Sequence, residues 1–371
     1  MDPTPGSTSS RRPHDARPAG RLVRAARDAD GCLRIHFLFF SALLPLLGAA
    51  SVRRDIAPGA IAVLVAVGLC FHVFAYVLND VVDLPIDRTQ PLRRDDPLVR
   101  GAIRPGQALG LALAAVPLGL AFTIAPPLRG GAAAAIALGV GFACMAVYDG
   151  YGKRAAFPPL TDAVQGVAWG SLVVAGALAV GGPATAGTWV AAAHAALFIL
   201  LINGIHGGLR DLANDLRGGA RTTAIVLGAR PRPDGGIDVP PAVAVFACAV
   251  TALVLAVDGA AVWGDALGYD AATRLRMLAV VGALAVPCVA LLGVLLRPRG
   301  PVWQVGFRLH LFLLLLLLPI LFVPLLSAAA RWTLGALLAL SMAAFVVSTD
   351  GVVVGQREGE RMERAGEGGM G

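Results

Sequence analysis

Long apolar stretches alternate along this chain with short segments that carry most of its charged residues. Each stretch approaches or reaches the length at which a helix crosses the roughly 30 Å hydrocarbon core of a bilayer. Because lipid offers no partners to backbone polar groups, such stretches fold as helices. The pattern therefore predicts an all-α integral membrane protein with nine or ten transmembrane helices, at about 35–50, 59–78, 106–126, 131–148, 164–182, 187–206, 241–257, 277–296, 307–326 and 333–350.

Composition and charge support this class. The chain has 371 residues, of which 57% are hydrophobic, and a net charge of +7. Most Lys and Arg residues fall on the side of the even-numbered connections, and few fall on the other side, namely Arg53, Arg54, Arg129, Arg274, Arg276 and Arg331. By the positive-inside rule, we expect a multi-pass protein of the cell membrane with its even-numbered connections, and both termini if there are ten spans, in the cytoplasm. Topology explains the basicity, so a nucleic-acid partner is not expected.

Three segments are expected along the chain. Residues 1–30, which are rich in Arg, Pro and Ser, and residues 353–371 predict disordered tails, and 31–352 predict one transmembrane domain. The five cysteines are scattered without a CxxC pair. They indicate small buried side chains, and neither a zinc site nor a disulfide framework.

The second span ends in a row of acids within "AYVLNDVVDLPIDR", residues 75–88. On a helix, Asp80, Asp83 and Asp87 have the spacing i, i+3 and i+7 and share one face. Pro85 predicts a helix break that re-aims Asp87, because proline lacks an N–H and clashes with the preceding turn. Acids at a helix C-terminus face the negative end of the macrodipole, so we expect positive charge nearby.

A second acidic cluster closes the sixth span in "HGGLRDLANDLRGGARTT", residues 206–223. Asp211 and Asp215, at i and i+4, share one helical face. The second and sixth spans end on the same side of the membrane, so the two acidic faces can meet. Oxygen ligands of this kind indicate Mg²⁺. Nearby Arg210, Arg217 and Arg221 suit a phosphate group.

A third polar segment, "YDGYGKR" at 148–154, ends the fourth span on the same side and holds Lys153, the single lysine of the chain. It is interpreted either as ordinary positive-inside flanking or as a phosphate-binding lysine with a phenol, Tyr148 or Tyr151, beside the acids.

These residues resemble the UbiA superfamily of intramembrane prenyltransferases, over about residues 30–330. Asn79, Asp80, Asp83 and Asp87 match its N-D-x-x-D-x-x-x-D motif, and Asp211 and Asp215 match its D-x-x-x-D motif. Tyr148 and Lys153 match its tyrosine–lysine element with one extra residue between them. The chain departs from the family where Asp96, in place of a basic residue, precedes Pro97, so the charge there would come from Arg93, Arg94 or Arg100. A tenth span would exceed the nine usual in the family.

The resemblance implies a helical bundle around a central cavity that transfers a prenyl group from a prenyl diphosphate to a lipophilic or aromatic acceptor, through an allylic cation. It implies Mg²⁺ as cofactor, held by Asp80, Asp83, Asp87, Asp211 and Asp215, and catalytic roles for all of these but Asp87. The residues expected to bind the diphosphate or the acceptor are Asn79, Arg94, Tyr148, Lys153, Arg217 and Arg221.

Two alternatives stay open at this stage. A terpene cyclase of the same superfamily would capture the cation with the substrate's own double bonds. A cation transporter would hold its acids near the bilayer midplane, which the five surface-side acids disfavour. The intramembrane polar residues either orient an acceptor or join helices by hydrogen bonds; they are His72, Gln165, Asn203 and His206.

Overall fold

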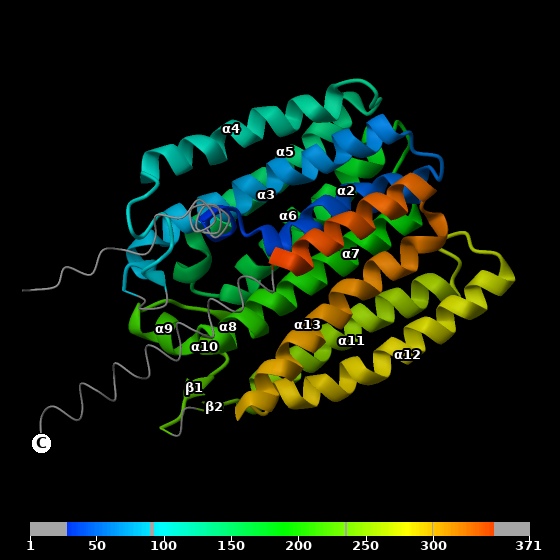
Figure 1. Cartoon of the computed structure of the whole chain (residues 1–371). Helices are drawn as coiled ribbons and strands as arrows, with labels where there is room; N and C mark the ends of the chain where they lie inside the picture. Colours follow the sequence, from blue (N-terminus) through cyan, green and yellow to red (C-terminus); the bar gives the residue numbers. More distant parts are fainter. Residues whose placement is uncertain (1–27, 90–92, 234–235, 299, 345–371) are drawn as a thin grey trace, which may run out of the picture.

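The structure, a computed structural model, describes residues 28–89, 93–233, 236–298 and 300–344 (Figure 1). In this part of the chain, nine helices are long and apolar enough to cross a membrane, which confirms the predicted class. They are Ile35–Val52, Pro58–Asp87, Pro105–Ile124, Gly131–Arg154, Pro158–Ala179, Ala186–Arg210, Pro241–Trp263, Ala271–Leu295 and Val302–Leu325. Of the predicted tails, only residues 28–30, which are helical, belong to the described residues.

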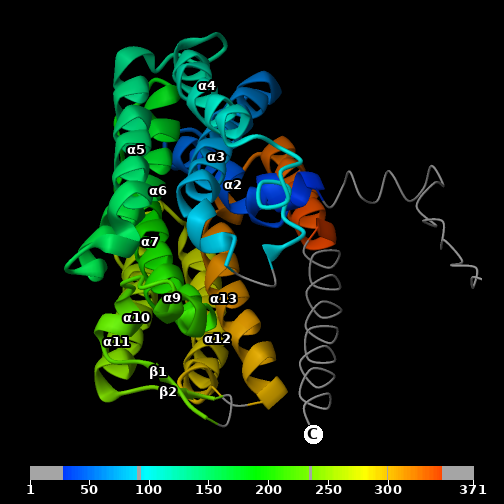
Figure 2. The same ribbon diagram turned by 90° about the vertical axis from the view of Figure 1, so that its left-hand side faces the viewer.

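The helices pack in two groups on either side of one span. The first group contains α2 (Leu38–Val52), α3 (Pro58–Asp87), α4 (Pro105–Ile124), α5 (Gly131–Tyr151) and α6 (Pro158–Ala179). The second contains α11 (Pro241–Trp263), α12 (Ala271–Leu295) and α13 (Gly300–Phe322). Between them lies α7 (Ala186–Leu201), which contacts both α6 and α11 (Figures 1 and 2).

The core is centred on α2 and α6, the two helices with the largest buried share. They approach so closely that Gly48 of α2 faces the carbonyl of Val173, and Gly176 of α6 faces the carbonyl of Pro45. Small residues at such crossings let helix backbones touch, which is the usual source of helix association in lipid. This contact sets the framework on which the other spans pack.

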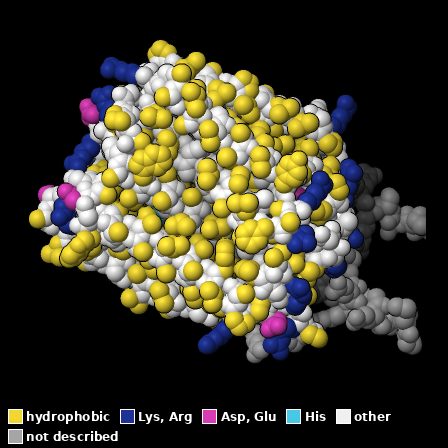
Figure 3. Space-filling view, turned by 180° about the vertical axis from the view of Figure 1, so that it is seen from behind, with side chains coloured by type: hydrophobic (Ala, Val, Ile, Leu, Met, Phe, Trp, Pro, Cys, Tyr) yellow, Lys and Arg dark blue, Asp and Glu magenta, His cyan; other side chains and the backbone are white. Residues whose placement is uncertain are grey.

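The outer surface is apolar between two charged edges. Hydrophobic side chains cover the face shown in Figure 3, and Lys and Arg gather along its opposite edges. Three largely exposed tryptophans lie at the ends of spans on the odd-numbered side, namely Trp189, Trp263 and Trp332. Indole rings favour the membrane–water interface, so these residues mark the boundary opposite the acidic motifs.

A further helix, Ala328–Ala344, follows the ninth span. It begins five residues before the predicted stretch 333–350, whose last six residues lie outside the described part. The hydroxyl of Ser341 accepts a hydrogen bond from the backbone N–H of Phe39 at 3.0 Å and donates one to the carbonyl of Ile35 at 3.3 Å. The helix therefore packs against the start of the first span.

Two local expectations are wrong. The helix α3 does not break at Pro85 but continues to Asp87, because a proline in the last turn removes only one late hydrogen bond. The end of the sixth span is not one regular helix. It passes through the π-helix η5 (Ile202–Gly207) and α8 (Gly208–Arg210), and it bends at Asp211 before α9 (Leu212–Arg217).

Candidate active site

The acidic ends of the second and sixth spans meet at one end of the bundle, on the left in Figure 1, through a lysine from the fourth span. Nζ of Lys153 lies 2.8 Å from Asp83 of α3 and 3.9 Å from Asp215 of α9. One ammonium thus neutralises acids from both sequence motifs. The expected meeting of the two acidic clusters is therefore present in this structure.

The fold holds Lys153 in place by its backbone. The residue lies in the 3₁₀ turn η4 (Gly152–Arg154) that extends α5. Its carbonyl accepts a hydrogen bond from the N–H of Arg221 at 2.8 Å, so the loop after α9 is tied to the end of the fourth span. A pocket of about 240 Å³ opens here, lined by Asp83, Asp149, Lys153 and the backbone around Gly218 and Gly219.

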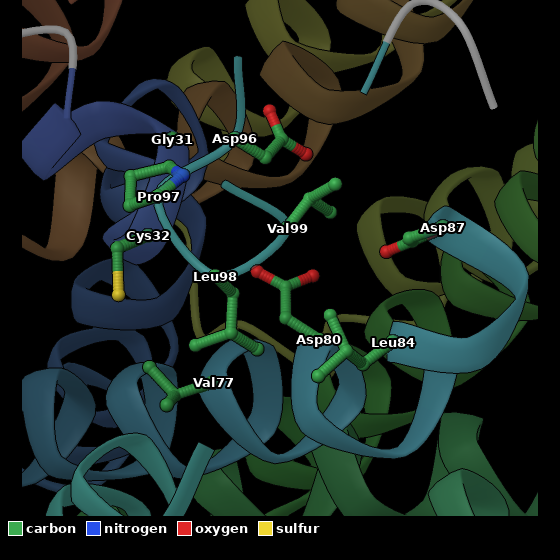
Figure 4. A pocket seen from close by; sticks show the side chains of 10 residues that line it. All are labelled: Gly31, Cys32, Val77, Asp80, Leu84, Asp87, Asp96, Pro97, Leu98 and Val99. Atoms are coloured by element: carbon green, nitrogen blue, oxygen red, sulfur yellow. The ribbon is translucent and has the colours of Figure 1, made fainter. Parts of the chain in front are cut away.

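The other two acids of α3 face a different side. Asp80 forms an ion pair with Arg34, whose guanidinium also lies 5.3 Å from the ring centre of Tyr76. Asp87 lies 3.6 Å from Arg93. Asp80 and Asp87 line a small pocket beneath the loop that contains Asp96 (Figure 4). The acids of α3 thus serve two adjoining pockets, with Asp83 in one and Asp80 and Asp87 in the other.

The two acids of the second motif differ in their surroundings. Asp211 receives two hydrogen bonds from its neighbour Arg210, at 2.9 and 2.6 Å. Desolvation acts to raise the pKa of Asp211, but the hydrogen bond and charge of Arg210 hold it below its ordinary value. Asp215 is only 3% exposed. Burial raises the pKa of Asp215 to about 6, although the charge of Lys153 acts against this shift.

A sixth carboxylate, Asp149, went unrecognised in the sequence. It is 7% exposed, and its Oδ1 accepts a long hydrogen bond of 3.4 Å from the amide of Asn79. Its Oδ2 is buried without a hydrogen-bond partner among the described residues. An unpaired buried carboxylate oxygen beside a pocket is costly unless a ligand satisfies it. The sequence signal was an acid beside Tyr148, at the end of the span that supplies Lys153.

Arg34 was also missed, and of the three loop arginines considered in the sequence, Arg93 is the one that reaches the acids of this site. Arg93 contacts Asp87 and lies 3.1 Å from Asp96, whereas Arg94 is exposed. Adjacent side chains of a tight turn point in different directions, so only one of the pair reaches the acids. Arg100 instead pairs with Asp28 at 2.5 Å.

The remaining predicted site residues lie around this centre. The ring of Tyr148 is half-buried against the hydrophobic core. Arg217 is exposed, and the guanidinium of Arg221 donates a hydrogen bond to the carbonyl of Ala156 at 3.0 Å. The structure thus assigns Arg221 a local contact that holds the loop, and gives no contact between Arg217 and the acids.

The donor set fits a hard divalent cation such as Mg²⁺. Within the described ranges, no three acidic, histidine or cysteine side chains converge as they would around an ion. Each acid of α3 faces an Arg or Lys instead. Yet Oδ2 of Asp149 is buried without a hydrogen-bond partner among the described residues, and Oδ1 of Asp215, which also lacks such a partner there, lies 3.9 Å from the ammonium of Lys153. Spare carboxylate oxygens beside a pocket are the ligands that Mg²⁺ prefers.

Comparison with known proteins identifies the fold and the family. No curated protein sequence matches the chain. Among solved structures, a UbiA homologue from Aeropyrum pernix K1 is similar with a TM-score of 0.59 and 21% identity, over 83% of this chain and 99% of that one. A digeranylgeranylglyceryl phosphate synthase gives a TM-score of 0.59 and 17% identity, over 80% and 97% of the two chains.

A UbiA homologue from Archaeoglobus fulgidus, bound to GPP and Mg²⁺, is similar with a TM-score of 0.56 and 16% identity, over 80% of this chain and 99% of that one. At such identities the likeness shows the shared fold. The sequence evidence is more specific, because residues 38–280 match the profile of the UbiA prenyltransferase family. The chain therefore belongs to the UbiA prenyltransferase family.

Proposed function

We propose that this protein transfers a prenyl group from a prenyl diphosphate to a lipophilic or aromatic acceptor inside the membrane, with Mg²⁺ as cofactor. The observation that carries the proposal is the contact of Lys153 with acids of both motifs beside a pocket. Such an arrangement of carboxylates and a cation suits a metal-bound diphosphate. Family membership supports the same activity.

The residues that would hold Mg²⁺ are the acids of the two motifs, Asp80, Asp83, Asp87, Asp211 and Asp215, with Asp149 as an additional candidate. Mg²⁺, when bound, offsets the negative charge of the diphosphate as it leaves. The A. fulgidus homologue, which is bound to GPP and Mg²⁺ in one structure and to DMAPP and Mg²⁺ in another, supports the use of Mg²⁺ together with a prenyl diphosphate.

The basic residues have the complementary task. Lys153, Arg34 and Arg93 each face an acid in this structure, and each would be free to contact a diphosphate if a bound metal neutralised that acid. The carbon–oxygen bond then breaks with its electron pair on the diphosphate, where these cations stabilise the developing charge. The acceptor attacks the resulting allylic cation among apolar walls that exclude water, and the proton displaced from the attacked atom of the acceptor passes to the released diphosphate.

We further propose that the active site faces the cytoplasm at the cell membrane. The acidic motifs lie at the end of the bundle where most Lys and Arg residues gather in the sequence, and the exposed tryptophans Trp189, Trp263 and Trp332 lie at the opposite end. The positive-inside bias assigns the former end to the cytoplasm. Labelling of single introduced cysteines in the connecting loops, in intact cells and in inverted vesicles, tests this orientation.

The activity is tested with the full-length protein in membranes. Membranes are incubated with Mg²⁺ and prenyl diphosphates of several lengths, with and without candidate acceptors, and products are identified by mass. Asp80→Ala and Asp211→Ala should each abolish turnover while the folded protein is retained, and EDTA should do the same. Wild-type rates in either variant would contradict the role of that carboxylate. Release of diphosphate and a cyclic product from prenyl diphosphate alone would favour the terpene cyclase alternative.

A further inference from the structure

Two histidines form a hydrogen-bonded pair inside the bundle, on the membrane side of the acidic motifs. His206 belongs to the π-helix η5 and His310 to α13, and both are almost completely buried. Nε2 of His206 lies 3.1 Å from Nδ1 of His310, and the two rings stack with their centres 5.2 Å apart. Only the first of these residues was considered in the sequence.

The hydrogen bonds determine which nitrogen carries each proton. Nδ1 of His206 lies 3.3 Å from the carbonyl of Leu201, which can only accept, so this nitrogen donates. In a neutral ring its Nε2 must then accept, and Nδ1 of His310 must donate to it. Nε2 of His310 is left with a free lone pair. That nitrogen is buried and has no hydrogen-bond partner among the described residues.

Another buried histidine near this end of the bundle, His72, is different. His72 uses both ring nitrogens, one with the hydroxyl of Ser41 at 2.7 Å and one with the carbonyl of Leu33 at 2.5 Å. These two hydrogen bonds connect α3 to α2 and to the segment before it, so His72 has a structural role. Nothing comparable satisfies His310, and a buried acceptor without a donor calls for an explanation.

The position of the pair relates it to the acids. His206 precedes Asp211 by five residues on the same span, which corresponds to about 7.5 Å deeper in the membrane for a helical rise. His206 itself lies in the π-helix η5, a form that recurs at functional sites. The amide nitrogen of Asn203, in the same π-helix, is also buried without a partner among the described residues. Two polar groups on the membrane side of the acidic motifs thus lack a partner among the described residues.

We propose that Nε2 of His310 binds the prenyl acceptor by accepting a hydrogen bond from its hydroxyl group, and that His206 is the positioning residue that fixes this tautomer. The inference rests on the proposed transferase function. It names the acceptor class as an alcohol or a phenol, because a lone pair in an apolar setting attracts an O–H donor and repels a carboxylate. The neighbouring ring of Phe307, 5.0 Å from His206, adds an aromatic wall.

The test compares ligands with and without the hydroxyl proton. Full-length protein in detergent is titrated with 4-dodecylphenol, with dodecan-1-ol and with the methyl ether of each, and affinity is read from the ligand-dependent shift of thermal unfolding. We expect the wild type to bind at least one hydroxyl compound about tenfold more tightly than its ether. The phenol and alkanol arms distinguish the two kinds of acceptor.

Two substitutions of His310 distinguish the roles of its two ring nitrogens. In His310→Asn the amide reaches only as far as Nδ1, so the donor to His206 is kept and the outer acceptor is lost. In His310→Gln the amide oxygen reaches the position of Nε2. We expect Asn to abolish the hydroxyl preference with ether binding unchanged, and Gln to retain most of it. His206→Phe should weaken the preference, and adding the Gln substitution at 310 should restore it, because an amide oxygen accepts without a fixed tautomer.

His194 supplies a matched control. Its Nδ1 lies 2.9 Å from Asp258, and its buried Nε2 also lacks a partner among the described residues, but it lies twelve residues before His206. His194→Asn should leave the preference unchanged. A wild type that does not distinguish either hydroxyl compound from its ether, or a His310→Asn variant that still does, would overturn the proposal. Stabilisation by Mg²⁺ with geranyl diphosphate, measured in the same samples, reports separately on the proposed function.

Discussion

The ammonium nitrogen of Lys153 lies 2.8 Å from a carboxylate oxygen of Asp83, and the two residues come from different spans. This contact links the fourth span to the first acidic motif, and Asp215 of the second motif lies 3.9 Å from the same ammonium. A lysine in this position stabilises the acids while no metal is bound, and it is within reach of a diphosphate that approaches the acids. The single lysine of the chain is therefore the side chain through which the three polar segments meet.

Substitution of Lys153 by Met should lower kcat/KM for the prenyl diphosphate by about 10²–10³-fold, the effect expected when one preorganised group that stabilises the leaving charge is lost. Initial rates of diphosphate release from membranes measure this effect. Arg104, in the connection between the second and third spans, is exposed and lines neither pocket. Arg104→Met therefore removes a positive charge without removing the contact and should change the rate less than threefold, by our expectation for a surface charge. Equal losses in the two variants would mean that only net charge matters.

Asp149→Asn should lower the affinity for divalent metal about tenfold, because loss of a carboxylate at or next to a metal site commonly costs this much. Binding of Mn²⁺ to the purified protein, followed by electron paramagnetic resonance, measures it without turnover. Asp162 is a suitable control, since it is a buried acid already satisfied by the hydroxyl of Thr223 at 2.5 Å. Unchanged Mn²⁺ affinity in Asp149→Asn would remove this residue from the metal site.

Asp215→Asn should stabilise the metal-free protein at neutral pH while it abolishes activity. Burial raises the pKa of Asp215 from 3.8 to about 6, so ionised Asp215 destabilises the folded state. This penalty is full above pH 6 and vanishes as the pH falls below 4. The variant should therefore gain about 1–3 kcal/mol at pH 7.5 and nothing at pH 4. Unfolding in the presence of EDTA at both pH values tests the prediction, and a less stable variant at pH 7.5 would contradict it.

Much of the fold and the general location of the site follow from the sequence. Apolar runs of bilayer length predict the spans, and counting them assigns Asp80, Asp83, Asp211, Asp215 and Lys153 to one end of the bundle. These relations depend on helix period and topology, which the sequence contains. The structure agrees that Asp83, Lys153 and Asp215 come together there.

What the sequence could not reveal depends on tertiary contacts. Arg34 has a left-handed backbone conformation, with φ of 46°, in the turn before the first span, and its approach to Asp80 follows from how that turn packs. Asp149 belongs to neither acidic motif of the sequence. Only its burial and its hydrogen bond from Asn79 identify it as a candidate site residue. Propensities also give no warning of a π-helix at Ile202–Gly207, since it depends on how neighbouring spans pack. The His206–His310 pair, which joins residues far apart in the chain, is unpredictable for the same reason.

The last prediction concerns the crossing of α2 and α6, which supports the whole bundle. A Cβ at Gly48 would overlap the backbone carbonyl of Val173, and this backbone has no flexible side chain that could yield. Gly48→Ala should therefore push the two helices apart and lower the free energy of unfolding by about 1–3 kcal/mol or more, as overpacking does in tight cores.

The matched control is Gly139, which lies within α5, where an added Cβ would meet nothing within 4 Å. Gly139→Ala should be neutral or slightly stabilising, because alanine is the better helix former. Thermal unfolding of the two variants in the same detergent measures the difference. Equal stability would mean that α2 and α6 separate at no cost, and the close crossing would then not be what holds the spans in position.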